Sequence, residues 1–542
     1  MRLSAIFQTL ILAALVVCCA LWANGEDESK YFTWEITYGT ISPLGKPQQG
    51  ILINGQFPGP PMELITNDNV IVNVINKLDE PFLITWNGIQ QRKNSWQDGV
   101  LGTNCPIPPG TNWTYKWQAK DQIGTYFYFP TIAMQRAAGG FGALNVAQRS
   151  VIPVPYPTPY GEFTFIVGDW YNTNHKDLRQ RLDAGEVLPL PDGLLINGHP
   201  SGLTFKGETG KQYMFRVTNV GISTSINFRI QGHTMLLVEV EGSHNLQVEY
   251  ESLDIHVGQS VAVLVTLNAN PKDYYIVASS RFTEHTILNT TAILQYDKSN
   301  TPASLPWPSG PTYQIHWSMK QARTILLNLT ANAARPNPQG SYHYKTINIT
   351  TTIELSNTET TINGTLRYAV NGISYSDPGT PLKLADYFKI PGVFTLNSIG
   401  YSPPPAGTPA KLGVPVIGRN LHDFVEIVFQ NEDKKKVQSW HLDGYSFYVV
   451  AYGHGTWSPA DREKYNMNDA IYRHTVQVYP AGWSAILVSM DNKGMWNLRS
   501  GIWDREYLGQ QLYVRVWDSQ ESLFLEYDIP QNALLCGKAK RR

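Results

Sequence analysis

Asn69–Asn76 reads N-V-I-V-N-V-I-N, a stretch in which every second residue is valine. Successive side chains of an extended chain point to opposite faces, so this alternation predicts a half-buried β-strand ending in asparagine. The same pattern recurs in Tyr213–Asn219, through Tyr213, Phe215 and Val217, and in Val425–Asn431. Three copies, each about one domain apart, indicate a triplicated all-β chain.

Each copy is preceded by an Ile/Val-Asn-Gly tripeptide, in which asparagine and glycine tolerate the positive φ angles of a tight turn. These tripeptides are Ile53–Gly55, Ile196–Gly198 and Val370–Gly372. Helix signals are sparse, the clearest being Lys176–Ala184 with Gly185 as its stop. We therefore predict consecutive β-sandwiches or Greek-key barrels.

Two proline-rich connectors, residues 153–159 and 301–311, divide the chain. Proline cannot donate a ladder hydrogen bond and stiffens the backbone, which is typical of a spacer. The predicted domains are residues 26–152, 160–300 and 312–542. Three domains suit a chain of 542 residues, since single cores stop growing near roughly 250–300 residues.

The N-terminal segment has the features of a secretion signal. Residues 3–22 form an apolar run that follows Arg2 and precedes Ala23–Gly25, whose small residues suit signal-peptidase cleavage. We predict that residues 1–25 are a signal peptide; a membrane anchor fits less well because the run is barely long enough to span. The C-terminal residues 535–542 lack the apolar tail of a glycolipid anchor signal. We expect an extracellular protein without a membrane anchor.

Removal of this segment leaves Cys105 and Cys536, which are expected to form a disulfide in an oxidising compartment, the alternative being two buried thiols. N-glycosylation is expected at the Asn-x-Ser/Thr sites Asn112, Asn289, Asn328, Asn348 and Asn363. The 43 lysines and arginines balance 44 acidic residues, so the chain has no net positive charge to attract a nucleic acid. A nucleic-acid-binding role is not expected.

A candidate metal strand lies at Gln438–Gly444, Q-S-W-H-L-D-G. Copper sites in β-sandwich proteins are built from imidazole nitrogens, usually with a thiolate. This stretch has the frame of such a strand but contains one histidine, His441.

Three other stretches carry a family resemblance: N-G-Q-F-P-G-P-P at Asn54–Pro61, I-T-W-N-G-I-Q at Ile84–Gln90 and G-T-Y-F-Y at Gly124–Tyr128. With them, essentially the whole mature chain resembles the plant multicopper oxidases, ascorbate oxidase most nearly. The resemblance implies three consecutive cupredoxin-like domains, with a mononuclear copper in the third and a trinuclear cluster between the first and third. It also implies a bridge from the first domain to the C-terminal tail, which suits Cys105 and Cys536.

Most of the copper-ligand positions implied by this resemblance hold residues that do not bind copper. The twelve implied positions are Thr85, Asn87, Phe129, Thr131, Gln438, His441, Asp443, Arg499, Ser500, Gly501, Arg505 and Gln510. Only His441 has the expected identity, whereas a copper site needs three or four correct donors. Arg499 and Arg505 would also oppose a cation electrostatically. We predict no cofactor, with copper at most as one ion.

This loss of ligands is similar to that in the monocopper-oxidase-like, or skewed-growth-like, proteins and the pollen-specific ascorbate oxidase homologues. That resemblance implies a role in cell-wall expansion or pollen-tube growth. Together with the missing ligands, the sequons and the secretion signal, it leads us to expect a catalytically inactive glycoprotein of the apoplast and cell wall, with a wall polysaccharide or wall protein as partner. Two alternatives remain. One is an oxidase with a single copper at His441, helped by Asp443 or His454. The competing interpretation is that His441 is a structural histidine, kept for its hydrogen bonds. The other is carbohydrate binding through exposed aromatic residues, which make up 12% of the chain.

Overall fold

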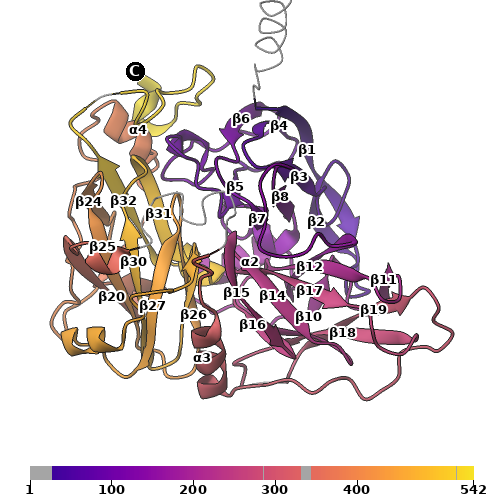
Figure 1. Ribbon diagram of the computed structural model, residues 1–542. Helices are drawn as coiled ribbons and strands as arrows, with labels where there is room; N and C mark the ends of the chain where they lie inside the picture. The colour runs from indigo at the N-terminus through magenta and orange to yellow at the C-terminus, as the bar shows by residue number, and fades with distance from the viewer. Residues whose placement is uncertain (1–26, 285, 331–342, 521, 542) are drawn as a thin grey trace, which may run out of the picture.

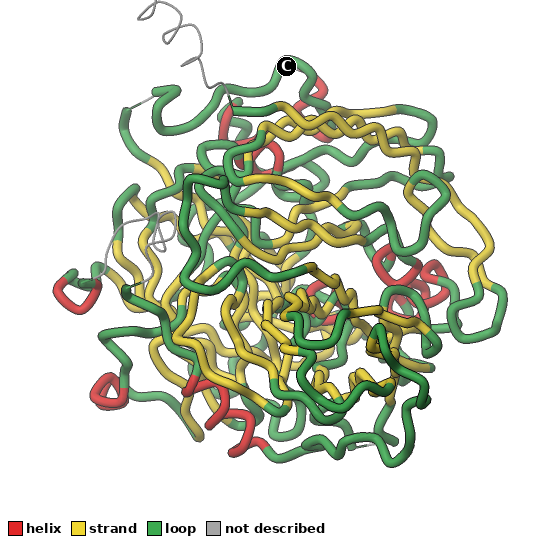
Figure 2. Tube along the Cα trace, turned by 45° about the vertical axis from the view of Figure 1, so that its right-hand side comes forward, coloured by secondary structure: helices red, strands yellow, loops and turns green. Residues whose placement is uncertain are grey.

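The computed structural model describes residues 27–284, 286–330, 343–520 and 522–541. The predicted signal peptide, residues 1–25, lies outside this part of the chain. Strands dominate the described residues, and the helices are short (Figure 2). In Figure 1 the first domain, indigo to purple, lies above the magenta second domain, and the orange and yellow third domain lies beside both. The predicted all-β class with three cupredoxin-like domains is confirmed.

The first domain packs two four-stranded sheets, ordered β2-β1-β4-β6 and β3-β8-β7-β5. Their strands are β1 Ser29–Ile41, β2 Gln48–Ile53, β3 Met62–Ile65, β4 Asn69–Asn76, β5 Ile84–Asn87, β6 Asn112–Gln118, β7 Gly124–Pro130 and β8 Gly142–Ala147, with 3-10 turns η1 Ser95–Gln97 and η2 Gln135–Ala138. Val70, Val72 and Val74 of β4 are fully buried while the residues between them are half-buried, as the alternation predicts. The strand therefore buries one face only.

The second domain pairs a six-stranded sheet, β10-β9-β12-β17-β14-β15, with a five-stranded one, β11-β19-β18-β13-β16. Its strands are β9 Gly161–Trp170, β10 Gly193–Ile196, β11 Leu203–Gly207, β12 Gln212–Asn219, β13 Ile226–Ile230, β14 Met235–Val240, β15 Ser243–Tyr250, β16 Ser252–Ile255, β17 Ser260–Thr266, β18 Asp273–Ser280 and β19 Asn289–Tyr296. The predicted helix is α2, His175–Asp183, which Asn174 caps by accepting a hydrogen bond from the Lys176 amide.

The third domain pairs an eight-stranded sheet, β23-β22-β21-β20-β25-β30-β27-β28, with a five-stranded one, β24-β32-β31-β26-β29. Its strands are β20 Thr351–Ile362, β21 Thr365–Val370, β22 Ile373–Tyr375, β23 Lys411–Gly413, β24 Val416–Asn420, β25 Phe424–Asn431, β26 Gln438–Leu442, β27 Phe447–His454, β28 Tyr472–Arg473, β29 Thr475–Val478, β30 Gly482–Ser489, β31 Gly494–Ser500 and β32 Gln511–Trp517. The remaining helical elements are α3 Ile315–Thr324, α4 Leu382–Tyr387, α5 Trp503–Tyr507, η3 Tyr344–Thr346, η4 Pro459–Lys464 and η5 Gly537–Arg541.

An apolar cluster and a disulfide both help to hold the domains together. One apolar cluster lies where all three meet and includes Phe129, Trp170 and Trp503. The other is a disulfide between Cys105 and Cys536, 431 residues apart in sequence with their Cα atoms 5.8 Å apart, which confirms the predicted pair. It fastens the C-terminal segment to the first domain and so stabilises the assembly of domains.

Candidate functional site

Strand pairing brings the predicted copper-ligand positions together inside the protein. In the first domain β5 pairs with β7 so that Thr85 lies opposite Phe129, and in the third β26 pairs with β31 so that His441 lies opposite Arg499. All of the predicted positions are buried. The side chains at these positions therefore determine the chemistry of a closed interior site.

The centre of this interior is an ion pair between Arg499 and Asp443, both less than 5% exposed. The Arg499 guanidinium donates to one Asp443 oxygen and, at 3.1 Å, to Asn497 Oδ1. The other Asp443 oxygen lies 2.9 Å from His441 Nε2, and His441 Nδ1 lies 2.8 Å from Thr475 Oγ1. Both imidazole nitrogens of His441 are thus engaged in hydrogen bonds with the chain.

The electrostatics of this cluster keep its charges paired. Burial by itself would raise the pKa of Asp443, but the Arg499 guanidinium and the hydrogen bond with His441 outweigh it and lower the pKa to about 2. Burial also lowers the pKa of His441, so its imidazole is neutral at physiological pH. Burial and the charge of Asp443 raise the pKa of Asp98, so Asp98 stays protonated more readily than a surface carboxyl.

In the first domain, an arginine and an aromatic ring lie where the resemblance implies the trinuclear cluster. The Arg136 guanidinium carbon lies 4.1 Å from the Phe129 ring centroid, in a cation–π contact. Burial lowers the pKa of Arg136 to about 9. Thr131 donates to the Gly99 carbonyl at 2.6 Å, and Asn87 donates to the Gly258 carbonyl at 3.2 Å. These polar groups bond to the backbone and do not converge on a common point.

The predicted mononuclear site is occupied by an amide network. Gln510 Nε2 donates to Gln438 Oε1 at 3.3 Å, and Gln438 Nε2 donates to Asn431 Oδ1 at 2.8 Å. Arg505 forms an ion pair with Asp433 at 2.9 Å. Ser500 Oγ accepts from the Ile502 amide at 3.1 Å. This predicted ligand position, where the resemblance implies a cysteine thiolate, therefore holds a short hydroxyl that caps a turn.

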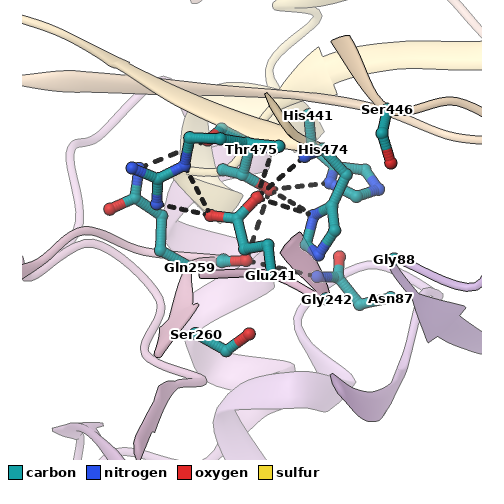
Figure 3. A network of polar contacts seen from close by, with 12 residues as sticks. Asn87, Gly88, Glu241, Gly242, Gln259, Ser260, His441, Ser446, His474 and Thr475 are labelled. Atoms are coloured by element: carbon teal, nitrogen blue, oxygen red, sulfur yellow. Dashed lines mark hydrogen bonds and ion pairs between the residues drawn. The ribbon is translucent and has the colours of Figure 1, made fainter. Parts of the chain in front are cut away.

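A second polar network, shown in Figure 3, ties all three domains together next to His441. Glu241, buried in the turn between β14 and β15, accepts from Arg473 at 2.6 Å and from the His474 and Thr475 amides at 2.8 Å each. Thr475 Oγ1 in turn contacts both His441 and His474. A carboxylate of the second domain thereby fixes the strand of the third domain that holds the His441 imidazole.

Four residues of the site, Asp98, Arg136, Glu241 and His474, were not predicted from the sequence. Each lies far in sequence from Gln438–Gly444, and no local spacing links it to that stretch. Contacts between domains cannot be inferred from such local patterns.

These side chains do not fit a copper ion. Within the described ranges, no group of three or more histidine, cysteine, aspartate or glutamate side chains is arranged to hold a metal. His441 and Asp443 bond to each other, and Arg499 adds a permanent positive charge beside them. His454, the other predicted helper, is bonded at 3.3 Å to His316 on the surface and not to His441.

The predicted glycosylation sites lie at or near the surface. Asn112, Asn289, Asn348 and Asn363 are exposed, and Asn328 is half-buried. No helix of the described segments is long and apolar enough to span a membrane.

The fold and the interior site define a class: three cupredoxin-like domains in series, in which strands of the first and the third carry the predicted copper-ligand positions. Family models described as multicopper oxidase match residues 35–151, 161–299 and 379–522. The chain belongs to the multicopper oxidase family.

Relatives with high identity extend along nearly the whole chain. An L-ascorbate oxidase homolog of Brassica napus is 53% identical, over 97% of this chain and 96% of its own length. The monocopper oxidase-like protein SKU5 of Arabidopsis thaliana is 49% identical, over 98% and 93%. Among solved structures, the multicopper oxidase Fet3p superposes with a TM-score of 0.75 at 22% identity, covering 90% of each chain, which supports the fold alone.

Proposed function

We propose that this protein is a secreted, glycosylated member of the family that has lost copper redox chemistry and acts as a binding component of the plant cell wall, in wall expansion or pollen-tube growth. The observation that carries the proposal is the buried Arg499–Asp443 ion pair at two cluster-ligand positions. A fixed guanidinium repels a cation, and moving it aside would leave the Asp443 charge unpaired in the interior. The names of two plant relatives, an ascorbate oxidase homolog and a monocopper oxidase-like protein, mark them as similar to oxidases.

The alternative of a single copper ion at His441 has one observation in its favour. The His441 and His474 rings lie 5.1 Å apart, and His474 Nε2 is buried without a partner in the described chain. That nitrogen packs tightly, however, since a Cβ added to Gly88 would lie only 2.4 Å from it. An ion there would need the Gly88 backbone to move, whereas copper sites in this fold are held by a rigid scaffold.

Copper content and oxygen uptake test the proposal. The purified secreted protein is incubated with copper and then desalted, bound copper is measured by elemental analysis, and oxygen consumption is followed with a reductant. We expect copper well below one ion per chain and no oxygen uptake above that of buffer.

The matched variants are His441→Ala and His316→Ala, the second removing a surface histidine that bonds to His454. Copper lost only in His316→Ala is surface binding and leaves the proposal standing. Stoichiometric copper that disappears in His441→Ala but not in His316→Ala, together with oxygen consumption, would establish the oxidase and refute the proposal.

The aromatic alternative finds few exposed tryptophans. Most tryptophans are buried, and among the described residues those with substantial exposure are Trp307, Trp317 and Trp517, at 41%, 38% and 39%. Stacking of sugar rings on tryptophan would therefore involve three partly covered side chains on separate segments.

A further inference from the structure

A cleft of about 420 Å³ lies on the first domain, away from the interior cluster. Its walls are the start of β4, the end of β6, the loop 91–94 and Tyr527 of the C-terminal segment. Figure 1 shows β4 and β6 side by side at the outer side of this domain, and β6 is the edge strand of its sheet. The volume is in the range of small-molecule sites, roughly 300–1,000 Å³.

The cleft is lined by cations and by no carboxylate of the described residues. Arg92, Lys93, Lys116 and Lys120 all contribute to its walls. Arg92 is partly neutralised, because it forms a 3.0 Å ion pair with Asp491. The described ion pairs include none for Lys93, Lys116 or Lys120, so their charge is available to a ligand.

Carboxylates near the cleft are occupied elsewhere. Asp491 lies behind Arg92, and Asp27, which accepts from Gln118 at 2.8 Å, forms an ion pair with Arg149. The positive charge at the cleft is therefore a local feature in a chain whose 43 basic and 44 acidic residues otherwise balance.

Two buried polar side chains of the cleft have no partner in the described chain. Gln91 is 2% exposed, and neither its amide oxygen nor its amide nitrogen is hydrogen-bonded. Trp117 is 4% exposed, and its indole N–H is also unpaired. Leaving a buried donor or acceptor unsatisfied costs about 1–3 kcal/mol in general. Both residues line the cleft.

Hydrogen bonds hold the loop 91–94 and the C-terminal wall of the cleft in place. The Lys93 amide donates to Asn492 Oδ1 at 2.9 Å, and the Lys93 carbonyl accepts from the Tyr527 amide at 2.8 Å. Trp96 Nε1 donates to the Tyr527 carbonyl at 3.0 Å, which anchors the C-terminal wall. A cleft preformed in this way does not have to be ordered by its ligand.

We infer that this cleft binds a carboxylate-bearing oligosaccharide, such as a chain of uronic acid units. The ammonium groups of Lys93, Lys116 and Lys120 would pair with the carboxylates. The amide of Gln91 offers both a donor and an acceptor, which suits sugar hydroxyls, and the exposed ring of Tyr527 at the rim offers an apolar face. An acidic peptide would use the charge but has fewer hydroxyls for the amide. The inference rests on the proposed wall function, for which it names the class of partner.

The test is calorimetric titration of the purified full-length protein with a short oligogalacturonide and with its methyl ester, which has the same sugars without the charge. We expect binding of the acid form that weakens as salt rises, and binding of the ester at least about tenfold weaker. Lys116→Gln combined with Lys120→Gln should weaken binding by about tenfold, because two exposed ionic contacts are removed.

The control pair is Lys206→Gln with Lys411→Gln, two exposed lysines on β11 and β23 of the other domains, which should bind like the unaltered protein. Gln91→Leu adds a separate readout: it should weaken binding several-fold without lowering thermal stability, since Gln91 has no partner in the described chain to lose.

Equal affinity for acid and ester, or unchanged binding in the Lys116/Lys120 variant, would overturn the inference. So would equal binding of a polyglutamate peptide or binding of inorganic phosphate alone, since neither is a saccharide. The copper measurement is independent, so a copper-binding oxidase refutes the proposed function while absent saccharide binding refutes only the cleft assignment.

Discussion

Replacing Asp443 with asparagine tests whether its charge stabilises the interior. The variant keeps the size of the side chain and a hydrogen bond to His441 but leaves the Arg499 guanidinium, 2% exposed, without a counter-charge. Breaking a buried ion pair by removing one partner costs about 3–5 kcal/mol. The pKa of about 2, against an ordinary value of 3.8, gives a second figure of roughly 2–3 kcal/mol. We expect a loss of about 3 kcal/mol.

The assay is denaturant unfolding followed by fluorescence of the buried tryptophans. A depressed folded-state pKa means that the stabilisation is complete above the ordinary pKa of Asp443 and is lost as the pH falls toward about 2. The unaltered protein should therefore lose stability through this window, and the variant, already lacking the charge, should lose about 2–3 kcal/mol less.

Asp79→Asn is the matched control, because Asp79 forms a surface ion pair with Lys176 and its side chain is 68% exposed. That substitution should change the unfolding free energy by less than about 1 kcal/mol. If Asp443→Asn destabilises no more than Asp79→Asn, the buried pair does not stabilise the fold and the reasoning is wrong. Combining Asp443→Leu with Arg499→Met should recover much of the loss, since apolar side chains remove both charges together.

Two further predictions concern stability. Cys105→Ser combined with Cys536→Ser should lower the unfolding free energy by about 2–5 kcal/mol, because the bond closes a loop of 431 residues; unchanged thermal unfolding would contradict this. Burial raises the pKa of Glu506 to about 7, so the unaltered protein loses unfolding free energy as the pH rises toward that value and the buried carboxyl must ionise. Glu506→Gln removes this loss and should therefore stabilise the protein near about pH 8 more than near about pH 5, by roughly 1–2 kcal/mol. Melting curves with the same shift at both pH values would exclude this role.

Several predictions came directly from local sequence and hold in the structure. The valines of Asn69–Asn76 point into the first core because β-strand side chains alternate with a period of two. The predicted helix at Lys176–Ala184 matches α2 to within a residue at each end. Cys105 and Cys536 are the only cysteines outside the predicted signal segment, so the sequence favoured their pairing, and the structure confirms it.

The interior site and the cleft were decided by tertiary structure. His441 was evident in the sequence, but its contacts with Thr475 and, through it, with Glu241 depend on how the second and third domains pack. The cleft joins Gln91 and Lys116 to Tyr527, more than 400 residues further along the chain than Lys116. Strand patterns arise from the geometry of neighbouring residues, whereas ion pairs and clefts arise from surfaces that meet only after each domain has folded. The sequence alone therefore determined the three β-domains and the residues at the ligand positions, and packing between domains determined which of their charges are paired.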